Sequence, residues 1–260
     1  MSTDFFHQSI YNYRGLCTWL NWPAFLSNTL FRPAFLVVTF ALVARFARGG
    51  EAEYAYVIGM IAYGATTILS GGIMQCFANE RTYGTLAFLF VSPAGRLRTF
   101  LSRAVPHYPN ALLCYGSGLA AAALILGTDF SQANWPAVVT GFLTIALSIS
   151  LFCLFLGSLC IIFRDWLVAA AFSEAALLIF TGVIIPVEKL PGVLGRISAV
   201  LPITHGLQAL RQAFSGAAIS GIAPALFQEA AVGVGYLLGG YLLFRLFELH
   251  VRRTGAYENA

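Results

Sequence analysis

The residues in this sequence that could do chemistry are few and lie far apart. It has no Gly-x-x-x-x-Gly-Lys-[Ser/Thr] segment to hold nucleotide phosphates, and its one lysine, Lys189, follows Val-Glu. Neither a His-Glu-x-x-His zinc motif nor a Gly-x-Ser-x-Gly nucleophile turn occurs. The five cysteines form no Cys-x-x-Cys pair, and the four histidines are widely separated (Cys17, Cys76, Cys114, Cys153, Cys160; His7, His107, His205, His250). We therefore expect no catalytic residue, metal site or cofactor in this chain, and only a hydrogen bond from His205.

One acid, Glu174, falls inside a long apolar run. A carboxylate is costly inside a bilayer and usually faces a partner or a polar cavity, which makes a functional role the first hypothesis. The alternative is a structural hydrogen bond to a neighbouring helix. The sequence leaves both interpretations open.

The elements that must position these residues are membrane-spanning helices. Of the 260 residues, 58% are hydrophobic and 10% are charged, whereas ordinary soluble domains carry about 25% charged residues. This composition predicts an all-α, polytopic membrane protein in which residues 1–260 form a single transmembrane domain. The formal net charge of +4 lies in short loops, so it reports membrane orientation rather than nucleic-acid binding.

Apolar runs predict six spans, at about 25–46, 54–78, 105–127, 136–163, 167–187 and 230–247. The aromatic-rich segment 5–23 before them is expected to lie in the interface as an amphipathic helix. The first span has only twelve uncharged residues in a row, Pro33–Ala44, so we assume that Arg32 and Arg45 extend to the two membrane surfaces. In the last span, Gly235-x-x-x-Gly239 would let two helices approach closely.

The basic residues predict which side each loop faces. Ten arginines fall in the N-terminal segment, the 79–103 loop, the 164–165 turn and the C-terminus, against five basic residues on the other side. Because cytoplasmic loops carry the excess of basic residues, both termini are expected in the cytoplasm.

The segment 188–229 is too polar and too broken to span a bilayer, yet too apolar for a plain loop. Leu190-Pro191-Gly192 and Leu201-Pro202 interrupt it. We expect two short re-entrant helices in the outer leaflet, where non-helical backbone must be covered by protein or water. The alternative is a seventh span over 212–228, which would move the C-terminus outside.

A compact polar stretch, residues 79–93, separates the second span from a basic cluster. As a helix it would carry Glu80, Arg81 and Gly84 on one side and apolar residues on the other, and Ser92-Pro93 would end it. Such a helix over 79–92 could dock a soluble partner. The alternative is an ordinary cytoplasmic loop.

Together these features resemble the membrane subunits, or permeases, of type-2 ATP-binding-cassette (ABC) exporters. The motifs that carry the resemblance are Glu80-Arg81-x-x-Gly84-Thr85-Leu86 … Ser92-Pro93 after the second span and Leu201-Pro202 … Arg211 before the last. The chain length, the interfacial helix, the six spans and the broken segment are similar along essentially the whole chain.

The resemblance implies roles for particular residues. In that family the 79–92 stretch is a coupling helix that docks on a separate ATPase subunit, which binds ATP and Mg. Ala87 departs from the pattern, because many relatives carry an acid there, and one docking contact would be reduced. The implied sites are ATPase coupling at Glu80, Arg81, Gly84, Thr85, Leu86 and Pro93, and a re-entrant segment with Pro202, His205 and Arg211.

The family works as two membrane halves with two ATPases, which implies a homodimer in the plasma (inner) membrane of a bacterium. The first, second and fifth spans would line the substrate path, so Glu174 is a translocation-path candidate. The 79–93 stretch looks closer to the drug and antibiotic branch, which implies export of an amphiphilic small molecule from the cytoplasm or inner leaflet. Two alternatives are export of a lipid-linked polysaccharide or glycolipid, and a non-transporting membrane assembly protein.

Overall fold

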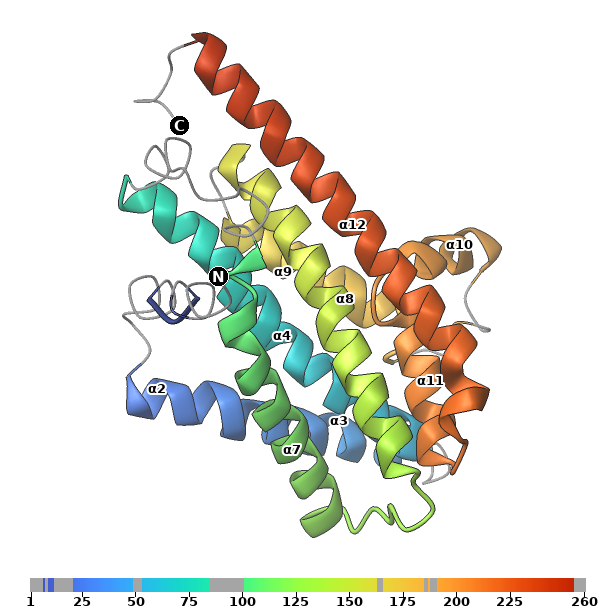
Figure 1. The fold of residues 1–260 in the computed structure, drawn as a ribbon. Coiled ribbons are helices and arrows are strands. Elements are labelled where there is room, and N and C mark those ends of the chain that lie inside the picture. Colours follow the sequence, from blue (N-terminus) through green and yellow to red (C-terminus); the bar gives the residue numbers. More distant parts are fainter. Residues whose placement is uncertain are drawn as a thin grey trace.

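The computed structural model describes residues 7, 9–11, 21–48, 53–84, 101–162, 166–184, 187 and 191–254 (Figure 1). Within these ranges the ordered elements are helices and no strand occurs, as the composition predicts. In chain order they are α2 (Trp22–Leu26), the π-helical turn η1 (Ser27–Phe31), α3 (Arg32–Arg48), α4 (Glu53–Thr82), the 3-10 turn η2 (Val105–His107), α7 (Tyr108–Leu124), α8 (Trp135–Ile162), α9 (Trp166–Phe180), α10 (Gly192–Val200), α11 (Thr204–Phe214) and α12 (Ile219–Thr254).

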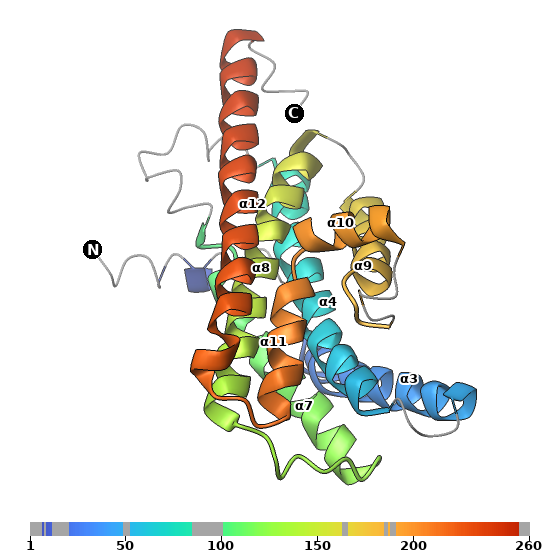
Figure 2. The same ribbon diagram turned by 90° about the vertical axis from the view of Figure 1, so that its right-hand side faces the viewer.

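The helices α8 and α12 lie side by side along the bundle (Figures 1 and 2). A Cβ on Gly233 would lie 2.9 Å from the Ser148 Cα, and one on Gly240 would lie 2.8 Å from the Phe155 Cα. Only glycine allows the two backbones to come this close. Gly235 faces open space instead, so the close approach uses glycines other than the pair expected from the sequence.

The helix α4 forms the centre of the bundle, between α3, α7 and α8. Within its span Tyr54–Glu80, 83% of an apolar 18-residue window is buried inside the protein, and Met60, Leu69 and Ile73 have no exposed surface. An apolar helix buried on all sides is typical of a bundle core. At about 1.5 Å per residue, this 30-residue helix is about 45 Å long.

The first predicted span is part of a longer helical segment, α2–η1–α3, which runs across the direction of α12 in both views (Figures 1 and 2). Asn21 begins it by accepting a hydrogen bond from the Ala24 N–H at 3.0 Å. Arg32 lies within this segment rather than at its start, and Arg45 donates to the Leu126 carbonyl at 3.1 Å. Most of the interfacial helix predicted over 5–23 lies outside the described residues.

Aromatic side chains join the helices at the end of the bundle where α11 and α12 meet. The Phe130 ring centroid lies 5.3 Å from that of Phe214, 6.0 Å from that of Tyr54 and 6.5 Å from that of Trp135. The Tyr54 hydroxyl also donates to the Phe214 carbonyl at 3.4 Å. These contacts connect the start of α4, the loop before α8 and the end of α11.

The fifth span is shorter than predicted. The helix α9 ends at Phe180 rather than near residue 187, because the chain turns at Gly182, whose φ is 84°. That left-handed conformation is favourable for glycine and is a common way to end a helix. Its 15 residues cover about 22 Å, less than the bilayer core of about 30 Å.

Two short helices, α10 and α11, follow, as predicted for the broken segment. The chain bends between them at Leu201-Pro202-Ile203. The last helix then begins at Ile219 rather than near 230 and continues without a break to Thr254. Residues 219–228 are therefore the first turns of the final helix, and the alternative seventh span over 212–228 does not form.

Four helical segments in the described part of the chain are long and apolar enough to cross a bilayer: Trp22–Phe46, Tyr54–Glu80, Trp135–Cys160 and Ile219–Phe247. The 17-residue α7 and the 15-residue α9 are shorter, so six spans stay a prediction. The C-terminal ends of α4, α8 and α12 lie toward one end of the bundle, and the α7–α8 and α11–α12 connections lie toward the other (Figure 1).

Candidate functional site

The last turn of α4 is fastened to the segment that leads into α7. Glu80 accepts a hydrogen bond from Arg103, and the two form a buried ion pair, with 5% and 2% of each residue exposed. The Arg103 guanidinium also lies over the Phe77 ring, 5.4 Å from its centroid. The Glu80 carboxylate thus faces the protein interior. The sequence had led us to expect it at the surface, in a docking contact.

The predicted coupling helix over 79–92 begins inside the second span. Residues 79–82 belong to α4, which places Arg81 in its last turn. The chain then turns at Tyr83 and at Gly84, an exposed residue whose φ is 67°. Thr85, Leu86 and Pro93 lie outside the described residues.

A close seam between α4 and η2 lies beside this ion pair. The Cys76 Sγ is 3.7 Å from the His107 Nε2, and both residues are buried. A Cβ on Gly72 would lie 2.3 Å from the His107 Nδ1. The end of α4 and the turn that leads into α7 are therefore in direct contact at this point.

Glu174 lies on α9 and is half-buried against α4. The Ser70 hydroxyl donates to its Oε1 at 2.8 Å, and the Tyr63 hydroxyl donates to its backbone carbonyl at 3.2 Å. The hydrogen bond to a neighbouring helix, one of the two interpretations of Glu174, is thus present. These two contacts fix α9 to α4 at one level of the bundle.

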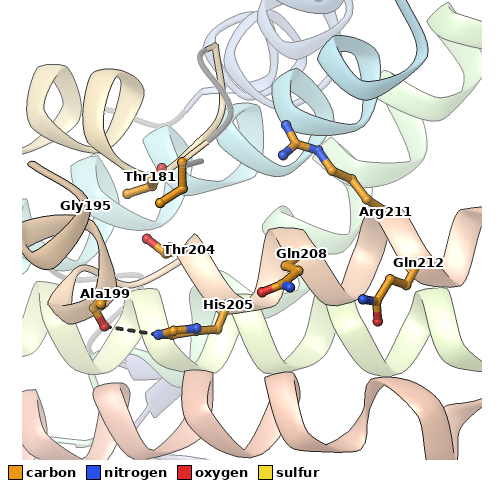
Figure 3. Close-up of a pocket in the computed structure, with 9 residues that line it drawn as sticks. Thr181, Gly195, Ala199, Thr204, His205, Gln208, Arg211 and Gln212 are labelled. Carbon is orange, nitrogen blue, oxygen red and sulfur yellow. Dashed lines mark hydrogen bonds between the residues drawn. The ribbon is translucent and has the colours of Figure 1, made fainter. Parts of the chain in front are cut away.

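A pocket of about 260 Å³ lies between the end of α9, α10 and α11 (Figure 3). The His205 Nε2 lies 3.1 Å from the Ala199 carbonyl of α10. Arg211 donates to the Gly182 carbonyl at 2.7 Å and to the Ala55 carbonyl at 3.4 Å. The structure thus brings these two predicted residues to one cavity, while the third, Pro202, is buried in the bend between α10 and α11.

The sequence did not lead us to the carboxylate that holds this bend, Glu229 of α12. Its side chain has no exposed surface and accepts hydrogen bonds from the backbone N–H of Ile203 at 2.6 Å and of Gly206 at 2.9 Å. These are orphan donors at the start of α11, which an acid stabilises also through the helix dipole. The clue was present, because Glu229 is the one acid between Glu188 and Glu248.

The same contact holds an unusual backbone conformation. Ile203 has a φ of 78°, the one positive value at a non-glycine residue in the described part of the chain. A β-branched residue is strained there by about 1–3 kcal/mol. The bond from its N–H to Glu229 and the complete burial of its side chain keep the chain in this turn.

Comparison with curated proteins finds no match for this chain. The family described as "ABC-2 family transporter protein" matches residues 36–242, which is well over half of the sequence and includes α4, α7–α11 and most of α12. The chain belongs to the ABC-2 family of transporter proteins.

Proposed function

We propose that this chain is the membrane subunit of an ATP-driven exporter that moves an amphiphilic small molecule, a drug or an antibiotic out of the cytoplasm or the inner leaflet. The observation that carries the proposal is the family match over residues 36–242 on an all-helical bundle with four candidate spans. Membership of this family implies a separate ATP-binding-cassette partner that hydrolyses ATP. ATP and Mg bind to that partner in this scheme.

The coupling site is the stretch that starts at the end of α4. Since Glu80 is buried against Arg103, its role in coupling is to position the stretch rather than to touch the ATPase. Arg81 and the residues from Gly84 to Pro93 then supply the docking contacts. The seam at His107 passes a displacement of this end to α7.

The orientation follows from the basic residues, ten of which lie in segments at one side of the predicted topology. That side is the cytoplasmic face of a bacterial plasma (inner) membrane, and both termini are cytoplasmic. The pocket between α9, α10 and α11 is then nearer the outer leaflet than the coupling site is.

The second membrane half is a copy of this chain that covers the exposed apolar surface of α9. Leu167, Val168 and Phe172 are 65%, 66% and 77% exposed on that helix. Cargo passes between the two halves, past the level at which Glu174 bonds to Ser70. An amphiphile suits a path with apolar walls and one carboxylate.

The test is purification of the tagged full chain from its native membrane in a gentle detergent. We expect an ATP-binding-cassette ATPase to co-purify, and the reconstituted pair to hydrolyse ATP faster when its cargo is added. Arg81→Glu should abolish co-purification, whereas the matched charge reversal Arg196→Glu on α10 should not.

Recovery of the chain without any ATPase would overturn the exporter proposal and favour the assembly protein. If the pair forms, candidate drugs and a lipid-linked oligosaccharide are compared as stimulators of ATP hydrolysis. Stimulation by the oligosaccharide alone would replace the amphiphilic small molecule as cargo.

A further inference from the structure

Between Phe31 and Val43, the exposed side of the helical segment is apolar except at Arg32 and Thr39. At about 100° per residue the exposed positions fall on one face, and its large side chains are Phe31, Phe35, Leu42 and Val43. The opposite face is buried, for example at Val37 and Ala41, and packs on α4 and α7. Arg32 is therefore the one charge in this stretch of apolar surface.

The backbone around Arg32 is fixed by two neighbouring helices. Pro33 has no N–H to donate to the Thr29 carbonyl, and the Cys114 thiol of α7 donates to that carbonyl instead, at 3.3 Å. The residues before Arg32 form the π-helical turn η1, a form that is frequent at functional sites. Pro33 also packs on α4, since a Cβ on Gly64 would lie 3.3 Å from the Pro33 Cβ. Arg32 is therefore held at the level of Gly64.

The level of Gly64 lies well inside the bilayer when α4 crosses it. At about 1.5 Å per residue, Gly64 is about 16 Å along α4 from Glu53 and about 24 Å from Glu80, and the bilayer core is about 30 Å thick. A charge at this depth is costly and usually has a counter-charge or faces water. In the part of the chain that the structure describes, Arg32 makes no hydrogen bond and no ion pair.

A charge of opposite sign lies nearby on α9. The Tyr63 hydroxyl donates to the Glu174 carbonyl at 3.2 Å, and both Arg32 and the Glu174 carboxylate act electrostatically on this hydroxyl. The Ser70 hydroxyl donates to one carboxylate oxygen, Oε1, at 2.8 Å. Among the described residues nothing donates to Oε2, and no ion pair joins Glu174 to Arg32. The two charges thus lie near the same hydroxyl without neutralising each other.

The two charges suit one ligand that carries both signs. A purely anionic ligand on Arg32 would leave the half-buried carboxylate without a counter-charge, and a purely cationic ligand on Glu174 would leave the guanidinium without one. The planar fork of an arginine fits a phosphate or a carboxylate, and a carboxylate pairs with an ammonium group. The apolar face around Arg32 offers a hydrocarbon tail a surface to cover.

We propose that Arg32 and Glu174 bind the headgroup of a zwitterionic amphiphile, with its anionic group on Arg32, its cationic group on Glu174 and its tail along the exposed face of α3. This inference rests on the proposed export function, because it names the chemical class of the cargo. It adds Arg32 to a path in which the sequence led us to expect Glu174 alone.

The binding test uses the full chain in neutral detergent and native mass spectrometry, with three amphiphiles that share one tail: dodecylphosphocholine, dodecyl phosphate and dodecyltrimethylammonium. We expect the zwitterion to bind more tightly than either singly charged amphiphile. Arg32→Gln should weaken dodecylphosphocholine and dodecyl phosphate by about tenfold and leave dodecyltrimethylammonium within about twofold. Glu174→Gln should weaken dodecylphosphocholine and dodecyltrimethylammonium instead.

The matched control is Arg196→Gln on α10, the same change at another exposed arginine that bonds to no described residue. It should change all three affinities by less than about twofold, because an isolated exposed charge is screened. Neither Arg32 nor Arg196 makes a bond that holds the described fold. Thermal unfolding should therefore give nearly the same Tm for both variants and the wild-type chain.

The chain and its co-purified ATPase in vesicles separate a cargo from a resident lipid. For a cargo, dodecylphosphocholine accelerates ATP hydrolysis, and ATP moves a fluorophore-labelled lysophosphatidylcholine across the membrane, as measured by dithionite quenching from outside. Arg32→Gln should lower both responses and Arg196→Gln neither. Binding without stimulation or movement would overturn the assignment as cargo and leave a resident lipid at this site.

Equal affinities of the wild-type chain and Arg32→Gln for dodecylphosphocholine would overturn the role of Arg32. An equal loss for all three amphiphiles, or the same loss in Arg196→Gln, would also overturn it, because the effect would then be general rather than recognition of a charge. If no ATPase co-purifies, the exporter proposal fails instead. The preference for the zwitterion is measured on the chain alone and does not depend on that outcome.

Discussion

Replacing Glu229 by glutamine tests how the bend before α11 is held. Glutamine has the same size, so no cavity forms, but one carboxylate oxygen becomes an NH2 group that opposes a backbone N–H. The carboxylate accepts from Ile203 at 2.6 Å and from Gly206 at 2.9 Å. A hydrogen bond to a charged group contributes about 1.5–3 kcal/mol, and a buried donor left without an acceptor costs about 1–3 kcal/mol. Glu229→Gln should therefore lower the free energy of unfolding by about 2.5–6 kcal/mol.

The control is the same substitution at another acid on a helix, Glu174 of α9. Glu174 is half-buried, and its carboxylate accepts one hydrogen bond, from the Ser70 hydroxyl at 2.8 Å. Glutamine keeps a side-chain oxygen that can accept the same bond. Glu174→Gln should therefore lower the free energy of unfolding by no more than about 1 kcal/mol. In thermal unfolding of the full chain in neutral detergent, at about 2–4 °C per kcal/mol for this size, Glu229→Gln should lower the Tm by about 5 °C or more and Glu174→Gln by less.

Amide hydrogen exchange locates the effect. In Glu229→Gln, exchange should rise first in the peptide around residues 203–206, because its amides lose their acceptor and the strained turn at Ile203 loses its support. Equal Tm values for the two variants would refute this reasoning. So would a general rise in exchange that leaves residues 203–206 as protected as before.

Three further predictions concern packing, orientation and the coupling end. Gly233→Ala should destabilise the protein by about 1–3 kcal/mol in thermal unfolding, because its Cβ would meet the α8 backbone, while Gly235→Ala, which faces open space, should be nearly neutral. A cysteine at the exposed Ser215 should react with an impermeant maleimide on intact cells; reaction only in inverted vesicles would reverse the proposed orientation. Glu80→Ala should cost about 3–5 kcal/mol by leaving Arg103 buried without this carboxylate, and adding Arg103→Met should recover part of the loss; no recovery would show that the pair is not the cause.

Helix boundaries set by local residues were predicted well. The fourth span was expected from about residue 136 and α8 begins at Trp135, and the expected break at Leu201-Pro202 separates α10 from α11. Such signals act within a few residues of where they stand in the chain. The predicted end of the fifth span, near residue 187, was wrong. A glycine in an apolar run gives no sign in the sequence of whether its φ will be positive. Gly182 takes that conformation only in the folded chain.

The partners of the charged residues could not be predicted, because they depend on tertiary contacts. Glu80 lies in a polar stretch that predicts a surface helix, yet its partner Arg103 comes 23 residues later and turns the carboxylate inward. Glu229 stands next to an apolar run, and its carboxylate oxygen accepts a hydrogen bond from Ile203, 26 residues earlier in the chain. Its isolation among apolar residues was the available signal, since a lone acid at membrane depth usually has a fixed partner.

The contacts of α11 connect the pocket with the far end of the bundle. Its first turn is fixed to α12 through Glu229, and its third is fixed to the start of α4 and the end of α9 through Arg211. The helix α4 is continuous from Glu53 to Thr82, so Ala55, which accepts from Arg211, and Glu80, which pairs with Arg103, lie near its two ends. If α4 moves as one rigid helix, a displacement of the end that carries the proposed coupling stretch shifts the Ala55 carbonyl relative to α11, whose first turn is bonded to α12. In an exporter, that relative movement would change the shape of the pocket at Arg211 without any contact between the pocket and the ATPase.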